Sequence, residues 1–216
     1  MPTCFLVLGV PRSGTSCVAG ILHHLGIRMG EYLGKEDDGV TDRWDWLGPD
    51  EWNAKGHFQD AAFVNFGYDV YGFPPQNPRR LMARERMTLG AIIAKRASFG
   101  VDWGVKDQML AFYLRDFVQF CPDPVKLLVT ERAANRAINS WKSRANDSLA
   151  ESTALIETIG TELTTRRAAV GLLSLTVNFD DLIDHTARTV GEIADFVGKP
   201  VNDAALNFPD ASLRNY

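Results

Sequence analysis

Residues 9–16, Gly-Val-Pro-Arg-Ser-Gly-Thr-Ser, have the composition of an anion-binding loop. A glycine stands near each end of this loop, and Arg12 places a cation inside it. The apolar residues 5–8 before the loop predict a buried strand, and apolar residues at helical spacing over 18–25 predict a helix after it. In this arrangement, backbone N–H groups and a helix N-terminus converge on an anion.

The loop differs from the G-x-x-x-x-G-K-[ST] pattern of proteins that bind ATP or GTP. Its glycines have the spacing of that pattern and Ser16 fills the last position, but Thr15 stands where the pattern has lysine. That lysine reaches the β- and γ-phosphates, so its absence argues against ordinary nucleoside triphosphate hydrolysis. Because the positive charge lies at Arg12 instead, we expect a different anion.

Two further charged residues, Lys106 and Asp107, end the short segment 101–107, which predicts a strand. In open α/β sheets the carboxyl ends of the strands face the ligand crevice. A cation and a carboxylate at such a point therefore favour a site, although a surface salt bridge at a strand end is the alternative interpretation.

Three segments resemble the sulfotransferases, which use 3′-phosphoadenosine 5′-phosphosulfate (PAPS) as sulfuryl donor. Lys106 resembles their strand-end lysine, which contacts the transferring sulfuryl group. Arg132 and Ser140, after the predicted strand 125–130, have the spacing of the Arg…Ser pair that holds the 3′-phosphate of the donor in that family. The 5′-phosphosulfate loop of the family is matched by Pro11, Arg12, Ser13, Gly14, Thr15 and Ser16.

The chemistry of these residues suits that donor. A guanidinium fork with a hydroxyl donor is well matched to a phosphate dianion. The resemblance implies that Arg12 and the N–H groups of 13–16 bind the 5′-phosphate leaving group, while Lys106 stabilises the charge that develops on the transferring group. The product would be adenosine 3′,5′-bisphosphate. A sulfuryl group carries less negative charge than a γ-phosphate, so no metal ion is needed in principle and no metal site is predicted.

The sequence offers three candidates for the general base. Many animal sulfotransferases have a histidine two positions after the lysine, but this chain has Gln108 there, so a carboxylate is expected. Residues 53–60 resemble a segment of bacterial and phage sulfotransferase-like proteins that contains acidic residues. Asp60 is therefore our first candidate, Asp107 the second and His57 the third.

The order of the predicted elements defines the expected fold. Strands at 4–9, 103–106, 125–130 and 174–179, each followed by a helix, predict a three-layer α/β sandwich with a central, mostly parallel sheet and the P-loop NTPase-like topology of sulfotransferases. We expect one domain over 1–216. Residues 27–79 look irregular and are expected to form an insertion or lid that shapes the acceptor pocket, with a short helix around 60–68. The other main predicted helices are 79–99, 109–120 and 146–171.

Composition limits the remaining function classes. The chain has 216 residues, and 45% apolar with 23% charged residues is ordinary for a soluble domain. Its net charge of −4, without a long basic run, argues against a nucleic-acid partner. The apolar segment 4–10 is too short to span a membrane, so we expect a cytoplasmic protein. Three cysteines without paired spacing predict neither a disulfide framework nor a zinc site.

Two alternatives to a sulfotransferase stay open. One is a nucleotide or small-molecule kinase with a degenerate phosphate loop, and the other is a nucleotide-binding relative without catalytic activity. The acceptor and the oligomeric state are not predicted, beyond a small molecule or glycan as acceptor.

Overall fold

The structure, a computed structural model, describes residues 1–30, 58–75, 78–145 and 147–210. Its described strands form one sheet in the order β2-β1-β3-β4, and every neighbouring pair is parallel. The strands are β1 (Cys4–Gly9), β2 (Trp103–Lys106), β3 (Val125–Glu131) and β4 (Ser174–Asn178). Because all four run in the same direction, the segments that follow them meet at one edge of the sheet.

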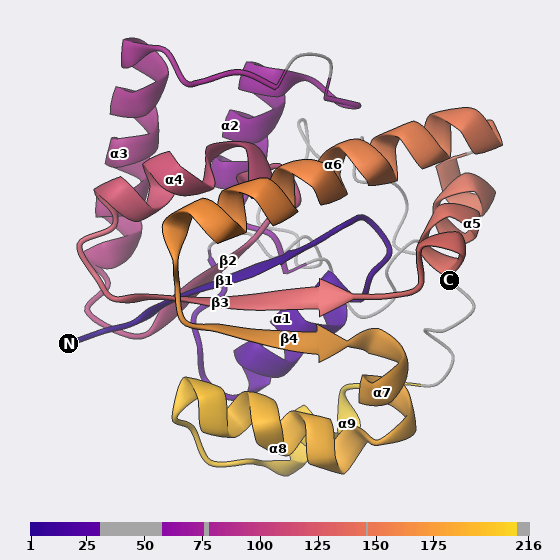
Figure 1. Cartoon of the computed structure of the whole chain (residues 1–216). Coiled ribbons are helices and arrows are strands. Elements are labelled where there is room, and N and C mark those ends of the chain that lie inside the picture. Colours follow the sequence, from indigo (N-terminus) through magenta and orange to yellow (C-terminus); the bar gives the residue numbers. More distant parts are fainter. Residues whose placement is uncertain (31–57, 76–77, 146, 211–216) are drawn as a thin grey trace, which may run out of the picture.

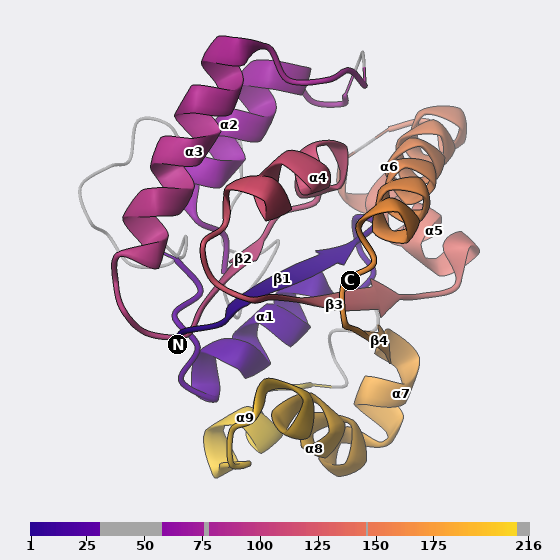
Figure 2. The same cartoon turned by 60° about the vertical axis from the view of Figure 1, so that its left-hand side comes forward.

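Helices cover both faces of this sheet (Figures 1 and 2). One face carries α1 (Thr15–His24), α7 (Phe179–Asp184), α8 (Thr186–Val197) and α9 (Asp203–Asn207). The other carries α2 (Ala61–Tyr71), α3 (Ala83–Ala97), α4 (Leu110–Phe120) and α6 (Leu149–Val170). Helix α5 (Ala134–Ala145) lies beyond the carboxyl end of β3 and leads into α6 (Figure 1). The predicted three-layer α/β architecture is confirmed.

Side chains of β1 alternate between two apolar cores. Cys4, Leu6 and Leu8 pack into the core under α4 and α6, while Phe5 and Val7 pack into the core over α1 and α8. All five are at most 1% exposed. A strand buried on both faces reads as a continuous apolar run, as β1 does.

The predicted strands agree with the structure to within about a residue at most ends, with one difference at β4. Phe179 was expected to end that strand but begins α7 instead. The side chain of Asn178 accepts hydrogen bonds from the backbone N–H groups of Asp180 and Asp181, at 2.9 and 3.1 Å, and so caps a new helix. β4 also lies at the edge of the described sheet.

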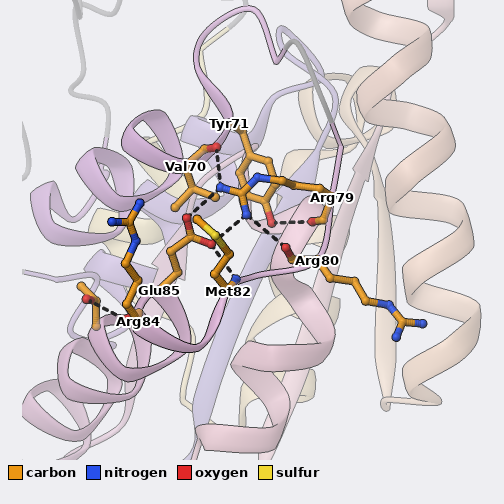
Figure 3. A network of polar contacts seen from close by, with 8 residues as sticks. Val70, Tyr71, Arg79, Arg80, Met82, Arg84 and Glu85 are labelled. Carbon is orange, nitrogen blue, oxygen red and sulfur yellow. Dashed lines mark hydrogen bonds and ion pairs between the residues drawn. The ribbon is translucent and has the colours of Figure 1, made fainter.

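Helix α3 starts later than the predicted residue 79. Glu85 in its first turn receives hydrogen bonds from both terminal nitrogens of Arg79, at 2.8 and 2.7 Å, and from the N–H of Met82, at 2.7 Å (Figure 3). Residues 79–82 lie outside the helix, and Met82 at its N-cap has an extended backbone. In the described ranges no helix is both long enough and apolar enough to cross a membrane.

Part of the region predicted to be irregular is helical. Within 27–79 the structure describes 27–30, 58–75 and 78–79, and α2 occupies much of the second range. This helix includes the one expected around 60–68 and continues to Tyr71. It packs against α3 on the same face of the sheet as α4 (Figure 2). The rest of the insertion or lid predicted over 27–79, residues 31–57 and 76–77, lies outside the described residues.

Candidate functional site

The loop of residues 9–16 joins β1 to α1 and is held to β3 by Ser13. The Ser13 hydroxyl is 2.7 Å from the carbonyl oxygen of Val10 and 2.7 Å from Oγ1 of Thr130, and the side chain is fully buried. The Ser13 N–H donates within the loop, to Val10 O at 3.2 Å. Ser13 therefore shapes the loop. The N–H groups suited to an anion are those of the first turn of α1, near Thr15 and Ser16, because a helix offers them no acceptor of its own.

Both glycines of the loop are required by close packing. A Cβ atom on Gly9 would lie 2.1 Å from Oγ1 of Thr130, and one on Gly14 would lie 2.2 Å from the ring of Phe179. Gly14 also has a φ of 93°, in the region that favours glycine. The glycine spacing that identified the loop thus has a packing cause as well as a conformational one.

Arg12 brings the predicted cofactor-binding residues together. Its Nε donates to the hydroxyl of Ser140 on α5 at 3.1 Å, and Nη1 of Arg132 donates to the Arg12 carbonyl oxygen at 3.3 Å. The Arg132 guanidinium also lies over the ring of Phe179, 5.0 Å from its centroid. Arg12 has a φ of 68°, which is uncommon for a residue with a side chain and occurs often at functional sites.

Lys106 ends β2, next to β1, and adds a second cation beside Arg12. Its side chain is 8% exposed. The pKa of Lys106 is lowered to about 8, chiefly by burial, while the Asp107 carboxylate raises it and the Arg12 guanidinium lowers it. Lys106 is in register with Val7 of β1, two residues before the loop that contains Arg12, and the Arg12 charge acts on it. Such a pair is favourable where an anion binds between them.

Asp107 is held in one orientation inside the protein. Its Oδ1 accepts from the N–H of Met109 at 3.1 Å, and its Oδ2 accepts from the hydroxyl of Tyr113 at 3.2 Å. Burial raises the pKa of Asp107 to about 7, although both hydrogen bonds and the nearby Lys106 act in the opposite direction. A carboxylate with a pKa near neutrality suits proton transfer.

Asp60 has a different environment from the one expected of a general base. It caps α2 by accepting from the N–H of Ala62 at 2.9 Å, and its two oxygens receive Nε and Nη2 of Arg96 at 2.5 and 2.9 Å. Asp60 is fully buried and Arg96 is 3% exposed. This geometry argues against proton abstraction by Asp60. His57, the third candidate, lies outside the described residues.

Several residues of the site had no signal in the sequence. Thr130 is hydrogen-bonded to Ser13, and Tyr113 is hydrogen-bonded to Asp107. Thr130 lies on β3, 117 positions from Ser13, and Tyr113 lies on α4, six positions after Asp107. No short sequence motif therefore links these partners. Among the described residues, no group of three or more His, Cys, Asp or Glu side chains is placed to hold a metal ion.

These features define a sulfotransferase-like α/β fold, as solved structures with the same architecture show. The sulfotransferase domain from the olefin synthase of Synechococcus PCC 7002 matches over 99% of this chain and 79% of that one, with a TM-score of 0.57 and 17% sequence identity. The sulfotransferase domain from the curacin biosynthetic pathway matches over 99% and 80%, with a TM-score of 0.55 and 13% identity. No family model and no curated protein matches the chain.

Proposed function

We propose that this protein is a sulfotransferase that uses PAPS as its sulfuryl donor. The proposal is carried by one observation: Arg12 in the loop is hydrogen-bonded to Ser140 and, through its carbonyl oxygen, to Arg132. These contacts support one cationic site that includes the residues expected at the 5′-phosphosulfate and at the 3′-phosphate. The two structural neighbours are sulfotransferase domains, which supports the same reaction class.

In the proposed reaction, the acceptor oxygen bonds to sulfur as the bond between sulfur and the 5′-phosphate oxygen breaks. Arg12 and the first N–H groups of α1 stabilise the departing phosphate. Lys106, with a pKa of about 8, is charged at neutral pH and stabilises the sulfuryl oxygens and the bridging oxygen. Arg132 and Ser140 bind the 3′-phosphate. The Ser140 hydroxyl can donate to this phosphate while it accepts from Arg12.

We assign the proton of the acceptor hydroxyl to Asp107. The charges of Asp107 and Lys106 act on each other, so the proposed base lies within electrostatic range of the group that stabilises the transferring sulfuryl. Its pKa of about 7 allows it to be ionised before the reaction and protonated after it. Asp60 is assigned a structural role, because it forms a buried, two-point ion pair with Arg96 and caps α2 through the N–H of Ala62.

Calorimetry tests the donor assignment. Adenosine 3′,5′-bisphosphate should bind at least about tenfold more tightly than AMP, a difference of one strong charge-assisted contact. Arg132→Ala and Ser140→Ala should remove most of that preference, whereas Arg188→Ala, on the exposed surface of α8, should keep it. Equal affinity for both nucleotides would contradict the proposal, and a preference for Mg-ATP would support the kinase alternative.

Turnover tests the catalytic assignment. Purified protein is incubated with PAPS and a panel of alcohols, and sulfate transfer is measured by mass spectrometry. Lys106→Ala and Asp107→Asn should lose at least about a hundredfold in rate, the scale of a positioned charge or base. Asp60→Asn should retain turnover in its folded fraction. Donor binding without transfer to any acceptor would support the non-catalytic alternative.

A further inference from the structure

Two cysteines lie against each other at the edge of the sheet where β1 begins (Figure 1). Cys4 is the first residue of β1, and Cys121 directly follows α4, in the turn that leads into β3. Both pack in the core under α4 and α6, where Cys4 is fully buried and Cys121 is partly exposed. Their thiols are hydrogen-bonded to each other, and neither is in a disulfide. We call these two residues the thiol pair.

The turn that carries Cys121 is fixed to the sheet on both sides of Cys4. On the β3 side, the Cys4 N–H donates to the carbonyl oxygen of Pro124 at 2.8 Å. On the β2 side, Trp103 is in register with Cys4, and its indole N–H donates to Oδ2 of Asp123 at 2.9 Å. The prolines before and after Asp123 restrict the backbone of the same turn. A bond between the two sulfurs therefore needs little movement of the backbone.

The two cysteines have the unequal environments that a stepwise oxidation needs. Cys121 is partly exposed, and the hydrogen bond with Cys4 is the main cause that lowers its pKa. Thiolate character and exposure make a cysteine the first to react with an oxidant. Cys4 is fully buried, and burial raises its pKa, so an oxidant in solution does not reach it directly. Cys4 is instead placed to attack Cys121 after that sulfur has been oxidised.

We propose that Cys4 and Cys121 form a reversible disulfide, with a hydroperoxide as the oxidant. The Cys121 thiolate attacks one oxygen of hydrogen peroxide, the O–O bond breaks, and hydroxide leaves and is protonated by solvent, so that Cys121 becomes a sulfenic acid. The Cys4 sulfur then attacks the Cys121 sulfur, the S–O bond breaks, and the leaving hydroxide takes the Cys4 proton. The two thiols lose two electrons, and one peroxide becomes two waters. A dithiol reverses the reaction by exchange.

The thiol pair lies at the opposite edge of the sheet from the candidate site. β1 runs from Cys4 to Gly9, and the loop that contains Arg12 follows its other end. The inference is therefore independent of the proposed function. The new bond would close a loop of more than half of the chain, and a disulfide that closes a long loop strongly restricts the unfolded state. We expect the oxidised protein to be the more stable form.

Peptide mass spectrometry after peroxide treatment tests the pairing. Folded protein is treated with hydrogen peroxide, its remaining thiols are blocked with N-ethylmaleimide in urea, and it is digested with trypsin without reduction. Cleavage after lysine and arginine places the three cysteines on different peptides, 1–12, 13–28 and 116–126. Peptides 1–12 and 116–126 should be recovered linked, and dithiothreitol should release them. Peptide 13–28 is the internal control, because Cys17 lies in the core on the other face of the sheet.

Single variants test the order of the two steps. Cys121→Ala should give no linked peptide. Cys4→Ala should leave Cys121 as a sulfenic acid, which dimedone traps as an adduct on peptide 116–126. Cys17→Ala is the matched control and should give as much linked peptide as the unaltered protein. The unaltered protein decides the inference even where a variant does not fold. If peroxide leaves its peptides 1–12 and 116–126 unlinked, or links peptide 13–28 equally often, the inference is wrong.

The thermal unfolding midpoint gives a second readout. The oxidised protein should unfold at least about 5 °C above the reduced protein, because the bond restricts the unfolded chain more than it strains the fold. Dithiothreitol should restore the lower midpoint, and peroxide should not raise the midpoint of Cys121→Ala. A linked protein that unfolds at the same or a lower temperature would show that the fold does not hold the two sulfurs in bonding position, and would also overturn the inference.

Discussion

Arg96 on α3 and Asp60 at the start of α2 form an ion pair that water hardly reaches, with Nε of Arg96 2.5 Å from Oδ2 of Asp60 and side chains 3% and 0% exposed. The guanidinium also donates from Nη2 to Oδ1 at 2.9 Å, so the contact has two points. It ties together two helices that are adjacent on one face of the sheet (Figure 2). Asp60 lies in the region 27–79, which was predicted to be irregular, and this ion pair gives its carboxylate a structural role.

Removing one partner of this pair should destabilise the protein strongly. Arg96→Met leaves the buried Asp60 carboxylate without its guanidinium, a change that typically costs about 3–5 kcal/mol. Urea unfolding measures the loss. The double variant with Asp60→Asn should be less destabilised than the two single losses added together. Arg188→Met, which breaks the exposed pair with Glu192, should change stability by less than about 1 kcal/mol. A small effect of Arg96→Met would show that the buried pair contributes little.

The depressed pKa of Lys106 predicts a pH-dependent stability. Burial, with Arg12, lowers this pKa from 10.5 to about 8. Because the pKa of Lys106 is lower in the folded protein than in the unfolded chain, its titration favours the folded state fully above pH 10.5. This contribution to the free energy of unfolding is lost as the pH falls from there through about 8. Lys106→Met should therefore be more stable than the unaltered protein at pH 7, by about 1–3 kcal/mol, and less so at higher pH. Chemical unfolding at pH 7 and pH 10 measures both differences, and an advantage that grows with pH would contradict the assignment.

The same lysine predicts how nucleotide binding depends on pH. Above about pH 8 an increasing fraction of Lys106 is neutral, so affinity for adenosine 3′,5′-bisphosphate should fall. The expected loss between pH 7 and pH 9.5 is about tenfold, on the scale of one charge-assisted contact. Calorimetry in buffers of different ionisation enthalpy should also detect proton uptake near pH 8. Lys106→Met should bind adenosine 3′,5′-bisphosphate more weakly, and its affinity should not fall between pH 7 and pH 9.5. If the affinity of the variant still falls with pH, a group other than Lys106 causes the pH dependence.

Tyr113 should act as a positioning residue for Asp107. Its hydroxyl donates to the carboxylate and so lowers the pKa of Asp107, against the larger effect of burial. Tyr113→Phe should raise that pKa, which moves the acidic limb of kcat/KM to higher pH by about one unit. Tyr71→Phe is the matched control, because the Tyr71 hydroxyl donates to the carbonyl of Arg79 instead. A pH profile that does not shift in Tyr113→Phe would show that this hydrogen bond does not tune the base.

Cys121 should be the most reactive of the described cysteines. A hydrogen bond with the Cys4 thiol is the main cause that lowers its pKa, and the side chain is partly exposed. Cys4 is buried, and burial raises its pKa, while Cys17 is also buried. Iodoacetamide at pH 7.5, followed by peptide mass spectrometry, should label Cys121 first. Equal labelling of the three in folded protein would contradict this order.

Much of the fold could be predicted because it depends on local patterns. β1 and β3 are apolar runs buried by helices on both faces, and such runs can be recognised without knowledge of the partner strand. The glycines near the ends of the loop and the placement of Arg132 and Ser140 after β3 are likewise features of short segments. The predicted boundaries failed where a side chain from outside the periodic pattern acts on the backbone, as Asn178 does in starting α7.

The sequence by itself determined the elements and the kinds of side chain at their ends: a loop for an anion, a lysine with a carboxylate, and an arginine with a serine. Only the tertiary structure decided which of these meet. Arg12 and Ser140 are 128 positions apart, and their contact depends on β3 lying beside β1 in the sheet. Burial cannot be read from a local sequence pattern. In the folded protein the buried Asp60 forms an ion pair with Arg96, and burial brings the pKa values of Lys106 and Asp107 toward neutrality. The physical reason is that desolvation and pairing act through space, whereas periodicity acts along the chain.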